Sequence, residues 1–139
     1  YSVDPEAYWG DYYFQEDPPS TTKPFIIFRH DQNSDVTTRI YGGRREIQSV
    51  AGSLDGNTVF VSMRETTTLT SDFEIFRLRI SPARTQQLTG NSSNDTNVSA
   101  SNTALRAVWE QDVAGKATIF LRIYNDLNTN SNFFEVSLS

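Results

Sequence analysis

The side chains that could do chemistry in this chain are carboxylates, carboxamides, hydroxyls and one histidine, because cysteine is absent. The histidine, His30, stands beside Asp31 at the end of a predicted strand, where an imidazole can act as an acid or a base. A catalytic triad or a multi-histidine zinc site needs further partners, and no second base or nucleophile stands at a recognisable spacing. The sequence therefore favours a hydrogen-bonded or solvent-facing histidine, and a chain that is not an enzyme.

Two runs of oxygen-bearing side chains have the alternate spacing that lets a turning loop aim several ligands at a hard cation. Both runs lack the glycine and the distal glutamate of the helix–loop–helix calcium motif. Asx-rich hairpin loops have the same composition without any metal, so we expect no cofactor and keep calcium as the alternative. The candidate ligands are Asp31, Asn33 and Asp35 in the first run and Asp126, Asn128 and Asn130 in the second.

Three acceptor sequons for N-glycosylation follow one another, at Asn91, Asn94 and Asn97. In a secreted eukaryotic chain they would be exposed glycosylation sites. A loop rich in Asn and Ser also produces sequons by chance, so the sequence leaves both interpretations open.

The composition excludes several classes of partner. The net charge is -5 and the basic residues are scattered singly except for Arg44 and Arg45, so no stripe exists that could neutralise several phosphates of a nucleic acid. No apolar run is long enough to span a membrane. Ser 15, Thr 15 and Asn 10 against two lysines are typical of strands and turns, and of an exported protein.

The start at Tyr1 suggests either an exported chain whose signal has been removed or a fragment of a longer one. Together with the composition, it leads us to expect a location outside the cytoplasm: periplasmic, cell-surface or secreted.

Short apolar and alternating runs predict an all-β fold, and no window has a convincing helical period. Turns that need a positive φ are expected at Asp55-Gly56, Ala114-Gly115 and Tyr41-Gly42-Gly43, and loops at Glu65 to Ser71 and Gly90 to Asn102. The predicted strands are Phe25 to Phe28, Thr58 to Met63, Phe73 to Ile80, Leu105 to Trp109, Thr118 to Tyr124 and Phe133 to Leu138.

An internal repeat organises these strands. A pair formed by isoleucine and an aromatic residue recurs at Ile40-Tyr41, Ile75-Phe76 and Ile119-Phe120, and each follows an earlier apolar-aromatic pair. Strand-only repeats of this length predict propeller blades, in which each small sheet buries its faces against its neighbours. Residues 25–139 then form about three blades, with the last segment as a full blade or an incomplete one. Closed propellers have four to eight blades, so three are too few for a closed monomer.

The stretch from Ser53 to Thr89 resembles the repeat of TolB-type β-propellers. Ser53-Leu54-Asp55-Gly56-Asn57 corresponds to the family's Ser-Pro-Asp-Gly-Lys, with leucine in place of proline, and Gln86-Gln87-Leu88-Thr89 to its Arg-Gln-Leu-Thr ending. The strands Val59 to Ser62 and Asp72 to Phe76 match the two strands between them. The resemblance implies that Asp55 and Gly56 form a structural turn and not a catalytic site.

Residues 1–24 differ from the rest and are interpreted as an aromatic, acidic arm followed by a proline-rich linker. The arm could pack onto its own blades, add as a strand to the sheet of a neighbouring copy, or form an exposed platform for carbohydrate. The candidate contact residues are Tyr8, Trp9, Tyr12, Tyr13 and Phe14.

These observations predict a non-catalytic binding or structural module whose partner is a protein, foremost another copy of the chain joined through the arm. Two alternatives stay open. The chain could be part of the propeller domain of a larger enzyme, such as a hydrolase of the prolyl-oligopeptidase type, or a periplasmic propeller for protein interaction.

Overall fold

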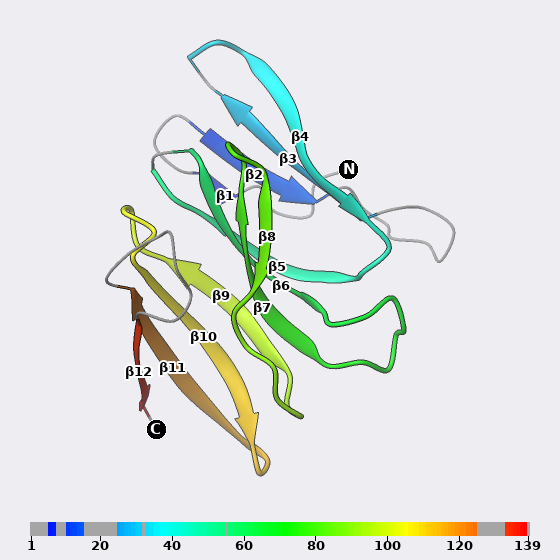
Figure 1. Ribbon diagram of the computed structural model, residues 1–139, viewed down its shortest axis with the longest axis vertical. Coiled ribbons are helices and arrows are strands. Elements are labelled where there is room, and N and C mark those ends of the chain that lie inside the picture. The colour runs from blue at the N-terminus through cyan, green and yellow to red at the C-terminus, as the bar shows by residue number, and fades with distance from the viewer. Residues whose placement is uncertain are drawn as a thin grey trace.

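The computed structural model describes residues 6–7, 11–15, 25–31, 33–54, 56–124 and 133–138. These residues form three antiparallel sheets of four strands, and each sheet consists of strands that are consecutive in the chain (Figure 1). The prediction of propeller-like blades, too few for a closed monomeric ring, is confirmed. Within the same ranges, a helix with the length and apolar character needed to cross a membrane is not found.

The first sheet contains β1 (Glu6–Ala7), β2 (Asp11–Gln15), β3 (Phe25–Asp31) and β4 (Val36–Gly43). The second contains β5 (Ile47–Gly52), β6 (Thr58–Arg64), β7 (Phe73–Arg79) and β8 (Arg84–Gln87). The third contains β9 (Asp95–Ala100), β10 (Arg106–Val113), β11 (Lys116–Tyr124) and β12 (Phe133–Leu138).

The middle sheet is covered on both faces. Strand β6 sends Val59, Val61 and Met63 into a core shared with the first sheet, and Phe60 into a core shared with the third. Successive side chains of a strand point to opposite faces, so a strand between two cores must be apolar at nearly every position. This explains the continuous apolar run in the sequence.

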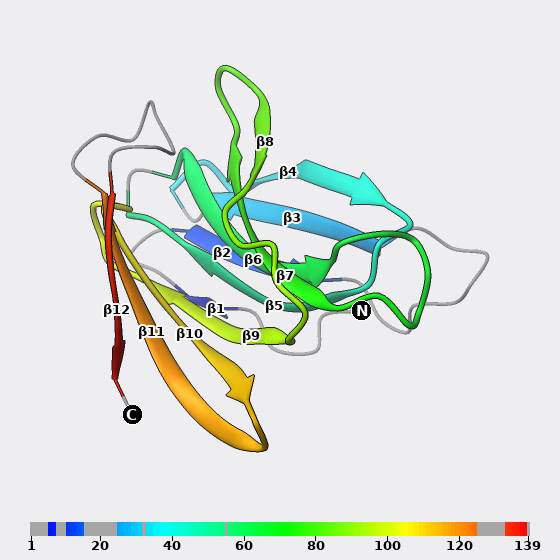
Figure 2. The same ribbon diagram turned by 60° about the horizontal axis from the view of Figure 1, so that its bottom comes forward.

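The sheets follow one another around the molecule in chain order, as Figure 2 shows. The first strand of the second sheet, β5, contacts β9 of the third sheet and β1 and β2 of the first. The leading strands of neighbouring sheets therefore lie side by side, as expected for adjacent blades of a propeller.

Residues 6–7 and 11–15 of the predicted arm belong to the first sheet. Strand β2 pairs antiparallel with β3 over five residues, from Asp11 opposite Asp31 to Gln15 opposite Ile27. This pairing satisfies one edge of β3 within the chain. Of the alternatives considered for the arm, the pairing of β2 with β3 agrees with an arm that completes a sheet of its own chain.

The repeat is out of phase in the first sheet. The pairs Val59-Phe60 and Ile75-Phe76 lie on the second and third strands of their sheet, as do the matching pairs of the third sheet. Ile27-Phe28 and Ile40-Tyr41 instead lie on β3 and β4, the third and fourth strands. The three hairpins are therefore not equivalent.

Two further predictions about local structure were wrong. The segment from Gly90 to Asn102 contains strand β9, because the side chains of Asp95 and Val98 are buried despite its polar composition. Gly42 and Gly43 end strand β4 and lack a positive φ. At Gly42 the end of the Arg39 side chain lies in the space that a Cβ atom would fill.

The predicted turn at Ala114-Gly115 is confirmed, with φ angles of 54° and 78° that are typical of a two-residue hairpin loop. A left-handed conformation costs alanine about 1 kcal/mol or more relative to glycine, and asparagine tolerates it better. We expect Ala114→Asn to raise the free energy of unfolding by about 0.5–1 kcal/mol, measured by urea denaturation.

Gly115→Ala is the matched control for this turn. A Cβ atom at Gly115 would meet open space, so backbone strain alone should lower the free energy of unfolding, by about 1 kcal/mol. Equal effects of the two substitutions would contradict the explanation.

Candidate functional site

Two carboxyl groups are fully buried at the junction of the second and third sheets. Glu74 comes from β7 and Asp95 begins β9, and neither residue has any exposed surface. The Glu74 carboxyl accepts a hydrogen bond of 2.6 Å from Thr89 Oγ1 and one of 3.0 Å from the backbone N–H of Asn91. Thr89 Oγ1 in turn accepts the backbone N–H of Ile75 at 2.8 Å, which closes the connection back to β7.

Asp95 is held from three directions. Its carboxylate accepts hydrogen bonds from Asn91 Nδ2 at 3.0 Å and from Gln111 Nε2 of β10 at 2.8 Å. Its backbone carbonyl accepts the buried Ser62 hydroxyl of β6 at 2.6 Å. One residue thus joins the central strands of two neighbouring sheets.

Burial disfavours the charged form of both acids. It raises the pKa of the Glu74 carboxyl to about 7, and the nearby Asp95 carboxylate raises this pKa further against the hydrogen bonds that lower it. Burial likewise raises the pKa of Asp95. Because neither group reaches the surface, this carboxyl pair can hold a proton and join the sheets, but it does not touch a dissolved substrate.

Sequence reasoning missed the carboxyl pair. Its members are far apart in the chain, and Asp95 lay inside a predicted loop. One local signal existed. Glu74 stands between Phe73 and Ile75 in strand β7, and this strand is buried on both of its faces. An acid in such a strand must find partners within the protein.

Two arginines form a second buried cluster at the same junction. Arg122 binds Glu135 through Nε at 2.8 Å and Nη2 at 2.7 Å, and donates to the backbone carbonyl of Leu88 at 2.6 Å. The Arg77 guanidinium lies over the Tyr124 ring, 4.7 Å from its centroid. These contacts fix the third sheet to the end of the second, and no role in catalysis follows from them.

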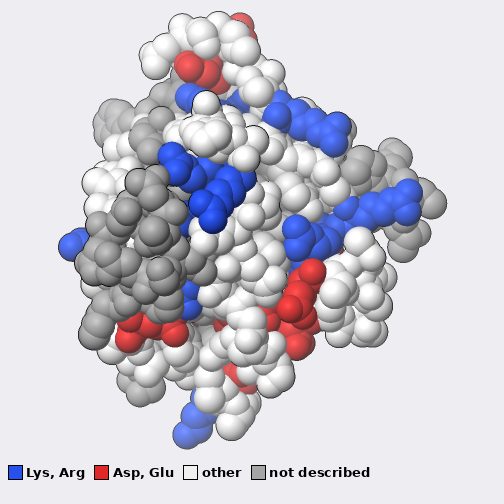
Figure 3. Space-filling model, in the orientation of Figure 1, with Lys and Arg blue, Asp and Glu red and all other residues white. Residues whose placement is uncertain are grey.

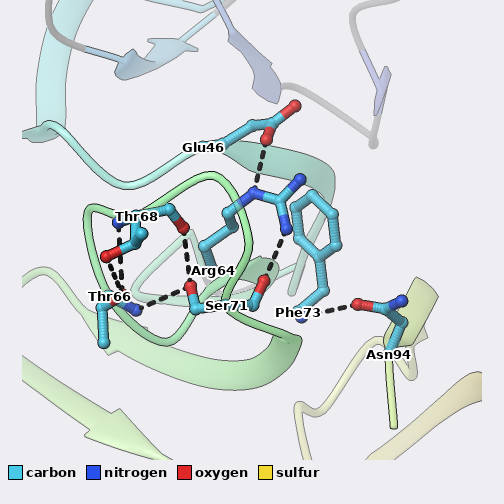
Figure 4. A network of polar contacts seen from close by, with 7 residues as sticks. All are labelled: Glu46, Arg64, Thr66, Thr68, Ser71, Phe73 and Asn94. Carbon is cyan, nitrogen blue, oxygen red and sulfur yellow. Dashed lines mark hydrogen bonds and ion pairs between the residues drawn. The ribbon is translucent and has the colours of Figure 1, made fainter. Parts of the chain in front are cut away.

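The loop between β6 and β7, residues 65–72, is held in shape by its own polar contacts, and we call it the rim loop (Figure 4). Arg64 at its base pairs with Glu46 at 2.6 Å, donates to the backbone carbonyl of Ser71 and lies over the Phe73 ring. Within the loop, the Ser71 hydroxyl and backbone N–H both donate to the carbonyl of Thr68. The backbone N–H of Phe73 donates to Asn94 Oδ1 of the next connection.

His30 and the first candidate calcium run lie at the β3–β4 turn. His30 Nδ1 is 3.0 Å from Thr37 Oγ1, in agreement with the predicted hydrogen-bonded histidine. The Asp31 carboxylate accepts the backbone N–H groups of Asn33 and Ser34, which lowers its pKa. Asp35 points into solvent and is 3.7 Å from the histidine ring. Asp31 therefore stabilises the turn.

The three sequon asparagines all make hydrogen bonds. Asn91 binds Asp95 and Asn97 binds Glu110 at 2.9 Å, each through the side-chain nitrogen that a glycan would occupy. Asn94 accepts a bond through its oxygen. The structure thus gives these asparagines roles within the fold.

Several predicted site residues fall outside the described structure. Gly56 has the positive φ of 63° expected of the turn, and Ser53 closes the turn onto Thr58, but its neighbour Asp55 lies outside the described residues. The side chains of Tyr12, Tyr13 and Phe14 are also outside them, and so are Tyr8, Trp9, Asp126, Asn128 and Asn130.

The charged side chains on the face seen in Figure 3 do not form a single basic surface. Lys and Arg gather there in separate groups with uncharged surface between them.

Comparison with known proteins gives likenesses in structure alone, because neither a family model nor a curated protein sequence matches the chain. A putative TolB from Agrobacterium tumefaciens matches with a TM-score of 0.63 at 17% identity, over 93% of this chain and 46% of that one. TolB from Acinetobacter baumannii matches with a TM-score of 0.64 at 15% identity, over 84% of this chain and 28% of that one.

This chain spans less than half the length of either TolB structure. At such low identity the likeness concerns the fold. With its three consecutive four-stranded sheets, the chain has the blade architecture of a TolB-like β-propeller and forms only part of one.

Proposed function

We propose that this chain is a non-catalytic module outside the cytoplasm that binds a protein partner through the rim loop. The observation that carries the proposal is the loop's combination of internal order and apolar exposure. Leu69 at its tip is 58% exposed, although the polar contacts around Thr68 and Ser71 fix the backbone beside it.

A loop with a fixed shape on a rigid sheet is a common location for binding residues. Because its backbone is already ordered, binding sacrifices little conformational entropy. Leu69 supplies an apolar contact, threonine hydroxyls supply hydrogen bonds, and Glu65 and Asp72 stand at the two ends of the loop. This chemistry suits a protein surface with an apolar pocket and a basic margin.

The location outside the cytoplasm is supported by composition. The chain has two lysines and an excess of Ser, Thr and Asn, which suits an exported protein. The non-catalytic role is supported by the burial of the carboxyl pair, whose pKa values are both raised by that burial.

The proposal is tested with immobilised chain and an envelope or secreted fraction of the source cells. We expect Leu69→Asp to reduce the amount of captured partner at least about tenfold, because a charge would enter an apolar contact. The partner is identified by mass spectrometry, purified, and measured against both forms by calorimetry.

Val36→Asp is the control. Val36 is 52% exposed, but it lies at the β3–β4 turn, at the end of β4 away from Glu46 and the rim loop. Equal binding by wild type and the Leu69→Asp variant would refute the rim loop as the binding site.

A second candidate function is favoured by the partial coverage of the TolB structures. Three blades could belong to the propeller domain of a larger enzyme, in which case the catalytic residues lie on another part of the polypeptide. The intact mass of the native protein, measured in material from the source, separates the two candidates.

A further inference from the structure

The outer face of the third sheet carries a group of apolar side chains, with Arg106 and Glu110 beside them. Trp109 and Phe120 pair on the face that packs against the second sheet, so the residues alternating with them point the other way. Cross-strand pairs on this outer face are Val108 with Leu121, Leu121 with Val136, and Ile119 with Leu138. Ile119 is 38% exposed and Leu138 is 54% exposed.

The first sheet lies at the other end of the array (Figure 1, Figure 2). Its own inner face carries Phe25 and Ile27 into the core, so Ile26 and Phe28 point outward. Both are partly exposed apolar residues. The two ends of the array thus offer a pair of apolar sheet faces, like the pairs already packed at the two internal junctions.

The charges on the two faces are also complementary. On the third sheet, Glu110 lies opposite Ile119, near the end of the sheet that carries the β10–β11 turn. On the first sheet, the Arg39 side chain lies across Gly42, close to where β4 ends. Both places lie on the side of the molecule that carries the rim loop. Gly43 precedes Glu46, whose carbonyl accepts the N–H of Arg64 beside this loop. Near the β10–β11 turn, Gln111 lies opposite Asp95, which follows Asn94, the acceptor for the N–H of Phe73 at the other end of the loop. If the two faces stack on each other, Glu110 of one copy and Arg39 of the other lie on the same side of the junction.

We propose that the outer face of the third sheet docks onto the first sheet of a second copy, so that two copies close head to tail into one ring of six sheets. The chain matches 46% of the length of the Agrobacterium TolB structure, so two copies supply nearly all of a fold of that size. Six blades fall within the range of closed propellers, and closure with two-fold symmetry removes both open faces. This proposal stands independently of the rim loop as a binding site.

The first test is the mass of the purified 139-residue chain in solution, by sedimentation equilibrium over a range of concentrations. We expect a dimer, and a dissociation constant that rises about 100-fold or more in Ile119→Asp and Leu138→Asp, since each places a charge in an apolar junction. Leu54→Asp is the matched control, because Leu54 is 37% exposed in the β5–β6 connection of the second sheet, away from both docking faces, and the dimer should stay intact. Circular dichroism and melting curves check that the monomeric variants remain folded.

The second test uses the absence of cysteine in the chain. A double variant, Ile26→Cys with Ile119→Cys, should form a covalent dimer on mild oxidation, whereas Ile119→Cys alone should not. Crosslinking of Ile119→Cys alone would show that third sheets meet each other, and a ladder of larger products would show an open array. Either result would overturn the proposal, and so would a wild-type chain that stays monomeric at high concentration.

Discussion

Replacing Phe60 with alanine is expected to lower the free energy of unfolding by about 3–5 kcal/mol, the largest effect of any substitution that we predict. Phe60 is fully buried in β6, and its ring packs against that of Tyr124 with centroids 6.4 Å apart. The substitution would remove the apolar area and leave a cavity between the second and third sheets, because the hydrogen-bonded backbone of each sheet resists the movement that would fill it.

Chemical denaturation of wild type and variant, with the same denaturant slope, measures this change. Leu69→Ala serves as the control, since Leu69 is an exposed residue and its truncation should change the free energy by less than about 0.5 kcal/mol. A loss of under about 1 kcal/mol for Phe60→Ala would mean that the sheets collapse around the missing ring, and that the junction is softer than its packing suggests.

Stability should also depend on pH through the carboxyl pair. With the pKa of Glu74 raised to about 7, the folded protein keeps a proton at pH values where an unfolded glutamate, with a pKa near 4.5, has released it. The folded state therefore binds more protons, and the free energy of unfolding falls as pH rises from about 4.5 to 7. The shift corresponds to a contribution of roughly 3 kcal/mol at most, present below this window and lost above it.

Glu74→Gln removes the titrating group but keeps a neutral side chain of the same size. We expect urea denaturation at pH 5 and pH 7.5 to show a much smaller difference in the variant than in wild type. Glu65→Gln removes an exposed carboxylate at the base of the rim loop and should preserve the wild-type difference. If Glu74→Gln retained the full difference, the proton would have to be held elsewhere, with Asp95 as the next group to replace.

The strands with a strong hydrophobic pattern were predictable. Strands β6 and β7 are buried at nearly every position because they lie between two cores, and their apolar residues gave them a clear strand signal. The turn at Gly115 has a residue type that permits its φ angle. The three-blade architecture followed from these repeats. Local pattern was sufficient wherever a residue's partner was the neighbouring strand or the solvent.

The missed features depend on partners far away in the chain. Strand β9 is polar in sequence, and it is a strand because Asp95 is bonded by Gln111 and Val98 enters the core of the neighbouring sheet. The carboxyl pair likewise exists only once β7 and β9 are placed at adjoining sheets. Local composition contains no information about such placements. From sequence alone, the polar strand β9 therefore cannot be told apart from a loop whose Asn and Ser residues form sequons by chance.

The strand order within each sheet has a consequence for how proteins of this kind change in length. Since every sheet is made of four consecutive strands, residues 47–87 form a self-contained unit whose hydrogen-bonded ladder draws on no other part of the chain. Duplicating or deleting the gene segment for such a unit would leave the hydrogen bonds of all remaining sheets intact. The sheets on either side of the change would then pack against each other through the same kind of junction. Genes for these proteins can therefore gain or lose whole blades in a single step, and shorter and longer descendants can share one architecture.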